Sequence, residues 1–422
     1  GYYQLDIPRH DDDVVLTIDG VDVYQLNDWD TNVATPNVWE GFLGTNSQIE
    51  FNIREFSGAS IGALAFNYLF GPDNDPNEFV WTGSVDTNPA LSGNWCSGLP
   101  SANGISDILV PANVPNYPSL PLTASIHELT IKEGAQVDLT SNNTLSLTGD
   151  LNNYGSIPAG ATNLEFAGAT QQNINGNSFE TENLTIDQGS DLVINLATDE
   201  MLRINATLSV ENGTLETNDQ LTLACRFDDL TQRVAQIGDL SNGSITGEII
   251  TEQCIPGTRA FRFLTSTVTS TNTIREDWQE DPLNYTHNPN PGYGTHITGV
   301  NGAADGTNGF DYTPSGNPSM YIFNNITSKW EKMPNTDNTS LIAGVPYRLM
   351  VRGNRSTDIT SNLSLPSNTI LRAQGSIASG TITMNNFNNV SGSANFFGNP
   401  YPAAIDMNLV LKNNINTTNF QS

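Results

Sequence analysis

The chain has 422 residues and is strongly acidic, with 16 Lys and Arg against 45 Asp and Glu and a formal net charge of −29. Such a surface repels nucleic acids and anionic lipid headgroups, so we expect no nucleic-acid partner. No apolar run approaches the ~18 residues that a membrane span requires, so we expect no membrane insertion. Abundant Gly, Asn, Thr and Ser, with aromatics spread throughout, predict an all-β, turn-rich chain of about two to four domains.

Residues 1–70 predict a β-sandwich-like module. The stretch HDDDVVLTIDGVDVY contains an alternating strand, a tight turn at Asp19 and Gly20, and a second strand, which is the pattern of a β-hairpin. The later stretch SQIEFNIREFSGASIGALAFNYL predicts two further strands, joined at Ser57 and Gly58.

This module resembles the C-terminal half of a PA14 module in its D-D-G-V-x-L-x-I-D-G stretch and in the strand pair that follows. The positions that match are Asp11, Asp12, Val14, Leu16, Ile18, Asp19, Gly20, Glu55, Gly58, Ala59 and Leu64, whereas Asp13 stands where the family usually has Gly. In sugar-binding members, an adjacent Asp pair holds a calcium ion that contacts glycan hydroxyls, and by position that pair is Asp11 and Asp12. Other PA14 modules are purely structural, so the resemblance leaves both roles open.

Residues 71–80 predict a linker rich in Pro, Asn and Asp, and residues 81–120 predict a Trp-rich cap. The order W-T-G, N-W, G-x-P and D-I-L-V-P is similar to a module that precedes Leu-headed, Gly-rich ladders on large surface proteins of Bacteroidetes. The matching residues are Trp81, Gly83, Asn94, Trp95, Gly98, Pro100, Asp107, Val110 and Pro111. We expect the tryptophans to cover the open edge of the first ladder coil, and an aromatic platform for sugars is the alternative.

Residues 121–225 predict a short right-handed β-solenoid. Alternating apolar runs end in Gly, Asn or Asp, and successive runs are headed by Leu129, Leu145, Leu164, Leu184, Leu202 and Leu221. Their spacings of 16, 19, 20, 18 and 19 residues suit one coil each. One coil cannot bury its apolar face, whereas stacked coils bury a continuous column. The alternative is a β-sandwich meander, whose strands also recur at short intervals.

Residues 226–422 predict a second β-sandwich-like region, with a long Asn-, Gly- and Pro-rich loop at 281–318. The region resembles the C-terminal part of Bacteroidetes proteins exported by type IX secretion. The phrases that carry the resemblance are IPGTRAFRFL, GYGTHITG, GNPSMYIFN, GVPYRLMVRGNRS and GNPYPAAID. The resemblance implies an extracellular, cell-surface location and contact with the type IX secretion machinery. More strands follow in that family, so we expect the region to be truncated at its end and the chain to belong to a longer protein.

The residues that carry chemistry form no catalytic constellation, and we expect no enzyme. The stretch GASIG at 58–62 fits G-x-S-x-G, but a strand pattern follows Ser60 where a nucleophile elbow needs a helix. The four histidines are far apart and lack metal-ligand spacing. The D-x-D-x-N runs that begin at Asp28 and Asp73 lack the Gly and the distal Glu of an EF-hand loop, so they are weak calcium signals.

Cys225 and Cys254 are expected to form a disulfide. Cys225 ends the last ladder strand and Cys254 lies in the strand pair that follows, so the bond would pin the open end of the solenoid to the next region. An exported chain meets oxidising conditions, which favour the bond. Cys96, in the Trp-rich cap, would then be left outside it.

These features favour a segment of an extracellular surface protein of a Bacteroidetes-type bacterium that works as a stalk or adhesin. A surface glycan, or another cell-surface component, is the expected partner. Two alternatives stay open: a calcium-dependent glycan-binding module, and a non-catalytic accessory region of a large secreted enzyme. The sequence of the rest of the reading frame would separate the stalk from the accessory region.

The calcium alternative makes a measurable prediction. If Asp11 and Asp12 bind calcium, the ion must raise the melting temperature of the chain, because a ligand that binds only the folded state stabilises it. Asp12→Ala would then remove both the rise and any calcium-dependent retention on glycan, while Asp28→Ala would do much less. We expect the structural outcome, in which thermal unfolding with calcium and with a chelator gives nearly the same melting temperature.

Overall fold

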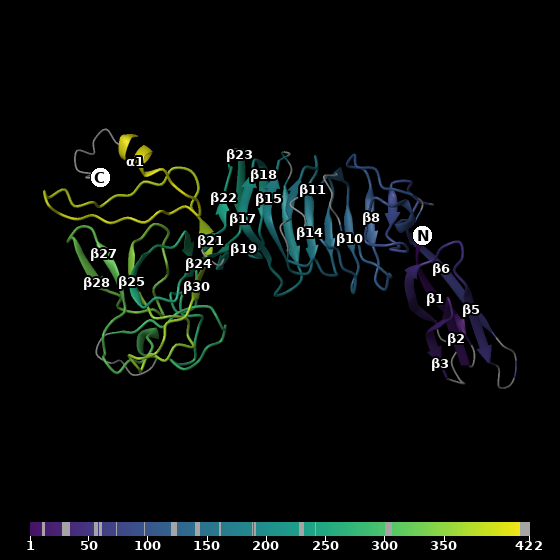
Figure 1. The fold of residues 1–422 in the computed structure, drawn as a ribbon, viewed down its shortest axis with the longest axis horizontal. Helices are drawn as coiled ribbons and strands as arrows, with labels where there is room; N and C mark the ends of the chain where they lie inside the picture. Colours follow the sequence, from purple (N-terminus) through teal and green to yellow (C-terminus); the bar gives the residue numbers. More distant parts are fainter. Residues whose placement is uncertain are drawn as a thin grey trace. The chain divides into compact units, whose positions relative to one another are not determined.

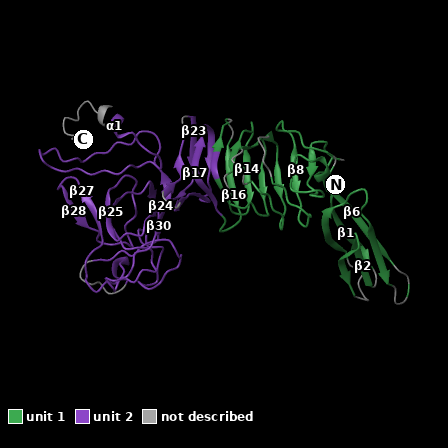
Figure 2. Ribbon diagram, in the orientation of Figure 1, with its two compact units in different colours: residues 1–181, 185–200 green, residues 182–184, 201–422 purple. Residues whose placement is uncertain are grey.

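In the computed structural model, the chain forms two compact units, coloured separately in Figure 2. Unit 1 contains residues 1–181 and 185–200, and unit 2 contains residues 182–184 and 201–422. The structure describes the whole chain except residues 11–12, 28–33, 55–57, 59–60, 73, 97, 120–124, 140–143, 160–161, 188, 190, 228–231, 241, 300–305 and 414–422. Strands dominate the described residues (Figure 1), which confirms the all-β prediction. None of the helices in these residues is long and apolar enough to cross a membrane.

Unit 1 begins with a small β-sandwich of two three-stranded antiparallel sheets, in the orders β4-β1-β6 and β3-β2-β5. Its strands are β1 (Tyr2–His10), β2 (Asp13–Ile18), β3 (Val21–Leu26), β4 (Thr35–Phe42), β5 (Ile49–Arg54) and β6 (Gly62–Phe70). Inward residues of both sheets, Leu5 of β1 and Leu16 and Ile18 of β2, form one buried cluster. The N-terminal sandwich is therefore present as predicted.

The expected hairpin in this sandwich is formed by β2 and β3 around Asp19 and Gly20. Ile18 pairs with Val21, and the two turn residues have φ of 49° and 82°. Positive φ at both central residues is the signature of the two-residue hairpin turn that Asp-Gly favours. The strands on either side of residues 55–61, by contrast, belong to different sheets, so this stretch links the two layers of the sandwich.

The Trp-rich segment covers the first coil with buried rings. Trp81 and Trp95 are 0% and 6% exposed, and their rings meet edge to face with centroids 5.0 Å apart. The indole N–H of Trp81 donates to the carbonyl of Asn116 at 2.7 Å. Asn94 is fully buried, and its Oδ1 accepts from the backbone N–H groups of Val85 and Asp86. The capping prediction fits this burial, and the alternative of an open sugar platform is wrong because neither ring faces solvent.

Parallel ladders follow in unit 1, in the orders β16-β14-β12-β10-β8-β7 and β13-β11-β9. Their strands are β7 (Glu78–Val80), β8 (Asp107–Val110), β9 (Ser125–Ile126), β10 (Leu129–Ile131), β11 (Thr144–Leu147), β12 (Leu151–Asn153), β13 (Asn163–Phe166), β14 (Gln172–Gly176) and β16 (Leu192–Leu196), and β15 (Phe179–Ile186) has residues in both units. In-register parallel strands exclude the meander alternative and confirm the β-solenoid. The ladder begins with β7 and β8, before residue 121.

The leucines that head the sequence runs do not all stack on one sheet. Leu145 and Leu164 are in-register partners on one ladder, which matches the spacing of 19. Leu129 lies on the other ladder, where it pairs with Ile108 and Leu151. The shorter first spacing therefore runs from a strand of one ladder to a strand of the other. The full repeat length appears only between leucines of the same ladder.

Polar side chains on the outer side of one ladder form a continuous hydrogen-bonded column. Asn195 Nδ2 donates to Asn175 Oδ1, and Asn175 Nδ2 donates to Asn152 Oδ1, at 3.1 and 2.8 Å. Asn152 Nδ2 in turn donates to Glu128 Oε1 at 2.8 Å. An amide has both a donor and an acceptor, so identical residues one coil apart satisfy each other. This explains why Asn recurs in runs such as LNN, NIN and VIN.

Unit 2 begins with parallel strands and then changes to antiparallel pairing. Its strands are β17 (Leu202–Val210), β18 (Asn212–Glu216), β19 (Leu221–Leu223), β20 (Cys225–Phe227), β21 (Gln232–Val234), β22 (Gln236–Ile237), β23 (Asn242–Thr246), β24 (Ile249–Ile255), β25 (Ala260–Leu264), β26 (Val268–Ser270), β27 (Met320–Asn324), β28 (Lys329–Lys332), β29 (Tyr347–Val351) and β30 (Thr369–Ile377), followed by helix α1 (Met407–Asn413). The order β17-β19-β24 is parallel, whereas β24-β30-β26 is antiparallel. Strand β24 is therefore the place where the solenoid ends.

The second sandwich-like region packs a four-stranded antiparallel sheet, β25-β29-β27-β28, over the residues of the long loop. The inner side of this sheet contributes Tyr347 and Leu349, which are 1% and 0% exposed. Trp278 from the loop side is 1% exposed, and its ring lies edge to face with Tyr347 at 5.5 Å. Burying side chains of this size supplies several kcal/mol each, at about 25 cal/mol per Å² of apolar surface.

The end of the solenoid is cross-linked. Cys225 of β20 and Cys254 of β24 form a disulfide with a Cα–Cα distance of 5.7 Å, the pairing expected from the sequence. The N–H of Cys225 also donates to Glu252 Oε2 at 3.0 Å. Glu252 is 1% exposed and holds both terminal nitrogens of Arg203 at 3.0 Å, so a buried ion pair and a covalent bond meet here.

We expect the disulfide to stabilise the chain substantially. In the chain-entropy model, a loop of this length contributes about 3–4 kcal/mol. The double variant Cys225→Ser with Cys254→Ser should lose about that much free energy of unfolding in urea titrations. Cys96→Ser, which leaves the disulfide intact, is the control. An unchanged denaturation midpoint in the double variant would show that the bond stabilises nothing.

Candidate functional site

The residues expected to bind calcium lie outside the described part of the chain. This holds for Asp11 and Asp12, for the run that begins at Asp28, and for Asp73. In the second D-x-D-x-N run, Asp75 Oδ1 accepts the backbone N–H of Asn77 at 2.8 Å, as in an ordinary Asx turn. Ser60 of the G-x-S-x-G stretch is also outside, and the residue two positions later begins strand β6, where a nucleophile elbow needs a helix.

The histidines have separate surroundings. His127 Nδ1 lies 2.6 Å from Asp107 Oδ1 on the first coils. His296 is 1% exposed, and its Nε2 lies 3.1 Å from the carbonyl oxygen of Arg355. His10 is fully buried, and neither ring nitrogen has a partner among the described residues. Within the described ranges, no three His, Cys, Asp or Glu residues form a group that could hold a metal ion.

Four carboxylates form a column on the first coils, and of these the sequence patterns singled out Asp107 alone. They are Glu78, Asp107, Glu128 and Asp150, each directly before an apolar residue on a strand of the same parallel ladder. Burial raises the pKa of Glu128, and repulsion from Asp107 and Asp150 adds to the rise. The signal in the sequence is an acid immediately before each apolar run, as in NEFV, SDILV, HELTI and GDLNN.

A buried ionic network fastens the long loop of unit 2. Arg355 donates through both terminal nitrogens to Asp311, at 3.0 and 2.8 Å, and both side chains are nearly inaccessible. Burial alone would raise the pKa of Asp311, but the hydrogen bonds and charge of Arg355 and the nearby His296, whose Nδ1 lies 3.5 Å from Asp311 Oδ2, lower it to about 2. Arg355 also donates to the carbonyl groups of Asn284 and His287. These donors are fully used within the chain, so the network has a structural role.

One cavity of unit 2, of about 290 Å³, is lined mainly by acids and amides. Glu280 is paired with Arg372, whose Nε lies 2.9 Å from both carboxylate oxygens. Asp277 is 4% exposed, and its Oδ2 has no hydrogen-bond partner in the described chain. Burial raises the pKa of Asp277 to about 6, against the lowering effect of hydrogen bonds from Ser270, Gln374 and Asn272. A neutral carboxyl group is therefore easily reached at this position.

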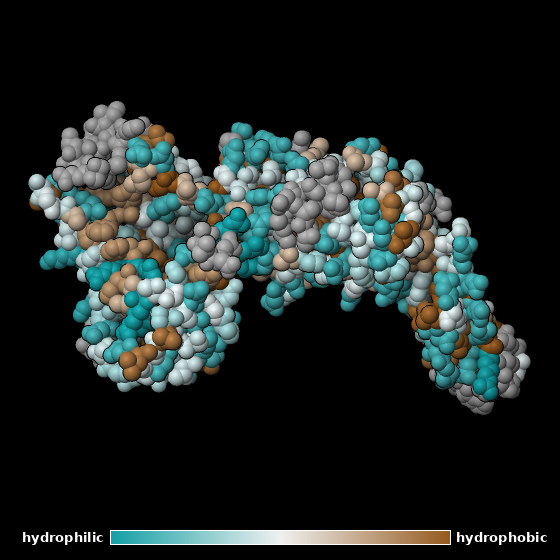
Figure 3. All heavy atoms as spheres, in the orientation of Figure 1, coloured by the Kyte–Doolittle hydropathy of each residue, from teal (hydrophilic) through white to brown (hydrophobic). Residues whose placement is uncertain are grey.

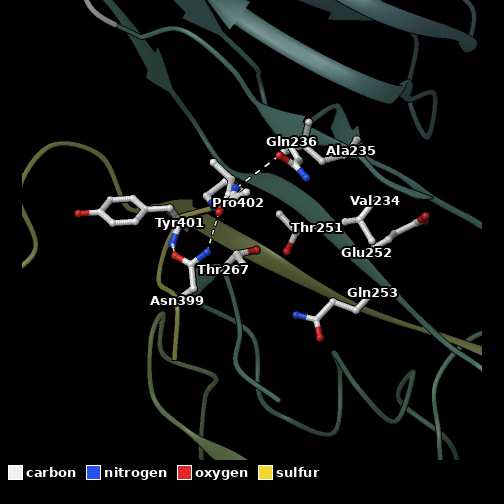
Figure 4. A pocket seen from close by; sticks show the side chains of 13 residues that line it. Val234, Ala235, Gln236, Thr251, Glu252, Gln253, Thr267, Asn399, Tyr401 and Pro402 are labelled. Carbon is white, nitrogen blue, oxygen red and sulfur yellow. Dashed lines mark hydrogen bonds between the residues drawn. The ribbon is translucent and has the colours of Figure 1, made fainter. Parts of the chain in front are cut away.

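Figure 4 shows another cavity of unit 2, of about 260 Å³, where residues 399–404 meet the end of the solenoid. The N–H of Ile237 donates to the carbonyl of Pro402 at 2.7 Å, and Gln236 Oε1 accepts from the N–H of Ala404. Asn399 Nδ2 closes the segment on itself by donating to the carbonyl of Ala403. The segment GNPYPAAID is therefore hydrogen-bonded to β22, and the cavity lies along that contact.

The outer side of the four-stranded sheet has a different character. Phe263, Arg348, Tyr321 and Lys332 are directly opposite one another across β25, β29, β27 and β28, so they share one face. Phe263 is 67% exposed, which is unusual for a phenylalanine. Figure 3 shows brown residues among teal ones over the part of unit 2 where Figure 1 labels these strands.

Aromatic rings gather along this outer side. Phe263 stacks on Trp330 with centroids 5.5 Å apart and planes at 27°, and both rings contact Phe396. Beside them, the Arg348 guanidinium lies 4.1 Å from the ring centroid of Phe261 and 5.4 Å from that of Tyr321. We call this surface the aromatic face, defined by Phe261, Phe263, Tyr321, Trp330, Lys332 and Arg348.

The aromatic face is the best candidate for a binding site. The other polar clusters of unit 2 use their donors internally, whereas this face presents rings and cations to solvent. Sequence reasoning missed it, although FRF and YRLMV show the alternation of a strand with aromatic and basic residues on one side. The pairing of β25 with β29, far along the chain, was needed to place these side chains together.

Comparisons with known proteins add no family to this description: no family model, curated protein or solved structure matches the chain.

The buried Asp277 predicts a pH-dependent stability. Its folded pKa, about 6, exceeds the ordinary 3.8 of the unfolded chain, so the folded state holds the proton more tightly. The stabilisation is complete below about pH 4 and is lost as pH rises through about 6, a change of about 3 kcal/mol. Asp277→Asn, which mimics the neutral carboxyl, should therefore gain stability relative to wild type between these pH values.

Urea unfolding of both proteins across this pH range measures the difference. Asp281→Asn, at a neighbouring side chain that is 73% exposed, is the control and should track wild type. If the gap between wild type and Asp277→Asn stays constant from pH 4 to pH 7, Asp277 does not titrate as described.

Proposed function

We propose that this chain is a segment of an extracellular bacterial surface protein that serves as a stalk and adhesin, with the aromatic face as its binding surface. The observation that carries the proposal is the 67% exposure of Phe263 beside the partly exposed Trp330 on a rigid antiparallel sheet. Exposed aromatic side chains, which have little rotamer entropy to lose, are the typical anchors of binding surfaces.

Two further features support a surface role. The disulfide between Cys225 and Cys254 suits a compartment outside the reducing cytosol. The solenoid pairs its strands in register and joins Asn152, Asn175 and Asn195 in a hydrogen-bonded column, which is the construction expected of a spacer. The resemblance of the C-terminal phrases to proteins exported by type IX secretion supports the same location and the same export route.

Adhesion of the whole chain tests this function. Beads that carry the wild-type chain should be retained under flow on at least one of three films: plant cell-wall polysaccharide, mucin or collagen. Phe263→Ala should reduce retention about tenfold, because loss of one central aromatic anchor costs about 1–2 kcal/mol or more.

Tyr154→Ala is the matched control, because Tyr154 is a 47% exposed aromatic of unit 1, whereas the four-stranded sheet belongs to unit 2. Wild-type beads that adhere to no film more than to albumin would refute the adhesin role. Equal retention of wild type and Phe263→Ala would show that the binding surface is not the aromatic face.

A further inference from the structure

The four strands that form the aromatic face contain more cations than carboxylates, whereas the chain as a whole is acidic. They contain the cations Arg262, Lys329, Lys332 and Arg348 and one carboxylate, Glu331, in a protein whose net charge is −29. Glu331 pairs opposite Ile322, so it lies on the other side of β28 from Lys332. By the same pairing, Arg262 lies opposite Leu349 and Lys329 opposite Asn324, so these two cations are also on the other side. The aromatic face therefore carries the two cations Lys332 and Arg348 and no carboxylate from its four strands.

The two cations of this face have no acidic or hydrogen-bond partner within the part of the chain that the structure describes. Neither Lys332 nor Arg348 forms a hydrogen bond or an ion pair there, and Lys332 is exposed. The buried Arg355 and the partly exposed Arg372, by contrast, are held by Asp311 and Glu280. The rings of Phe261 and Tyr321 lie on one side of the Arg348 guanidinium, because their centroids are only 6.1 Å apart. A guanidinium that stacks on a ring keeps its in-plane N–H groups for an acceptor.

The spacing of the row suits an extended ligand. Phe263, Arg348, Tyr321 and Lys332 occupy four neighbouring strands, and strands lie about 4.8 Å apart, so the row spans about 14 Å. Rings and cations alternate along it. A ligand that matches the row has apolar faces and anionic groups in the same alternation.

We propose that the aromatic face binds an anionic glycan, whose sugar rings carry carboxylate or sulfate groups. The C–H groups of a sugar ring pack on the electron-rich faces of Phe263 and Trp330, and the anionic groups accept from Arg348 and Lys332. A nucleic acid also carries anionic groups, so single-stranded DNA is included in the test as a competing ligand. This inference rests on the proposed adhesin function and names its ligand class.

The test uses the full chain and two matched pairs of polymers. Polygalacturonate is compared with its fully methyl-esterified form, and dextran sulfate with dextran, so only the charge differs within a pair. A chelator is present throughout, which removes any calcium-dependent binding at Asp11 and Asp12. Biolayer interferometry at low and at physiological salt measures the affinities. We expect the charged member of at least one pair to bind about tenfold or more tightly than its neutral partner, and less tightly as salt rises.

Variants distinguish binding at the aromatic face from attraction by the net charge of the chain. Lys332→Gln and Arg348→Gln should each weaken binding to the charged polymer about tenfold, as expected for loss of a charge-assisted hydrogen bond. Lys132→Gln removes one positive charge from unit 1, where Lys132 pairs with Glu40, and should leave binding unchanged. Lys332 is exposed, so its variant keeps the test valid if Arg348→Gln misfolds.

Several results would overturn the inference. These are equal affinity for the charged and neutral polymers, no binding to either pair, equal weakening by Lys132→Gln, or equally tight binding of single-stranded DNA. Preference for polygalacturonate assigns carboxylate as the recognised group, and preference for dextran sulfate assigns sulfate. Wild-type beads that adhere to films but show no preference for charged polymers refute this inference alone, whereas beads that adhere to no film refute the adhesin function.

Discussion

In-register parallel pairing is the constraint on which the solenoid depends. A parallel strand has no neighbour within its own coil, so every backbone group and every apolar residue must find its partner one coil away. Leu129 illustrates this, since it is buried only because Ile108 and Leu151 lie above and below it. The same rule applies to polar residues, which explains the column of asparagines. Repetition in the sequence is therefore a condition of stability.

Much of the fold could be read from the sequence because its signals are local. The Asp19-Gly20 hairpin, the recurring Leu of each coil and the Trp pair of the cap all follow from neighbouring residues. The ladder boundaries were less accurate, because β7 and β8 are short and lie among turn residues. The change from parallel to antiparallel pairing at β24 has no local signal, since β30 lies more than a hundred residues further along the chain.

The candidate site was hidden for the same reason. Phe263 and Arg348 are separated by the long loop, and only the β25–β29 pairing gives them one face. Alternation in each strand predicts that two sides differ, but it does not say which side is covered. Here Trp278, which precedes the long loop, packs on one side, and the aromatic and basic residues remain on the other. Cys225 and Cys254, in contrast, could be paired from sequence because few cysteines compete.

The disulfide also determines how tension would pass through unit 2. A pulling force that reaches Cys225 along the backbone crosses directly to Cys254 through the sulfur atoms. Strands β21, β22 and β23 lie within the closed loop, so they cannot be drawn out and add no length to a stretched chain. A chain held at one end and pulled at the other would thus keep these three strands in place until the disulfide is reduced.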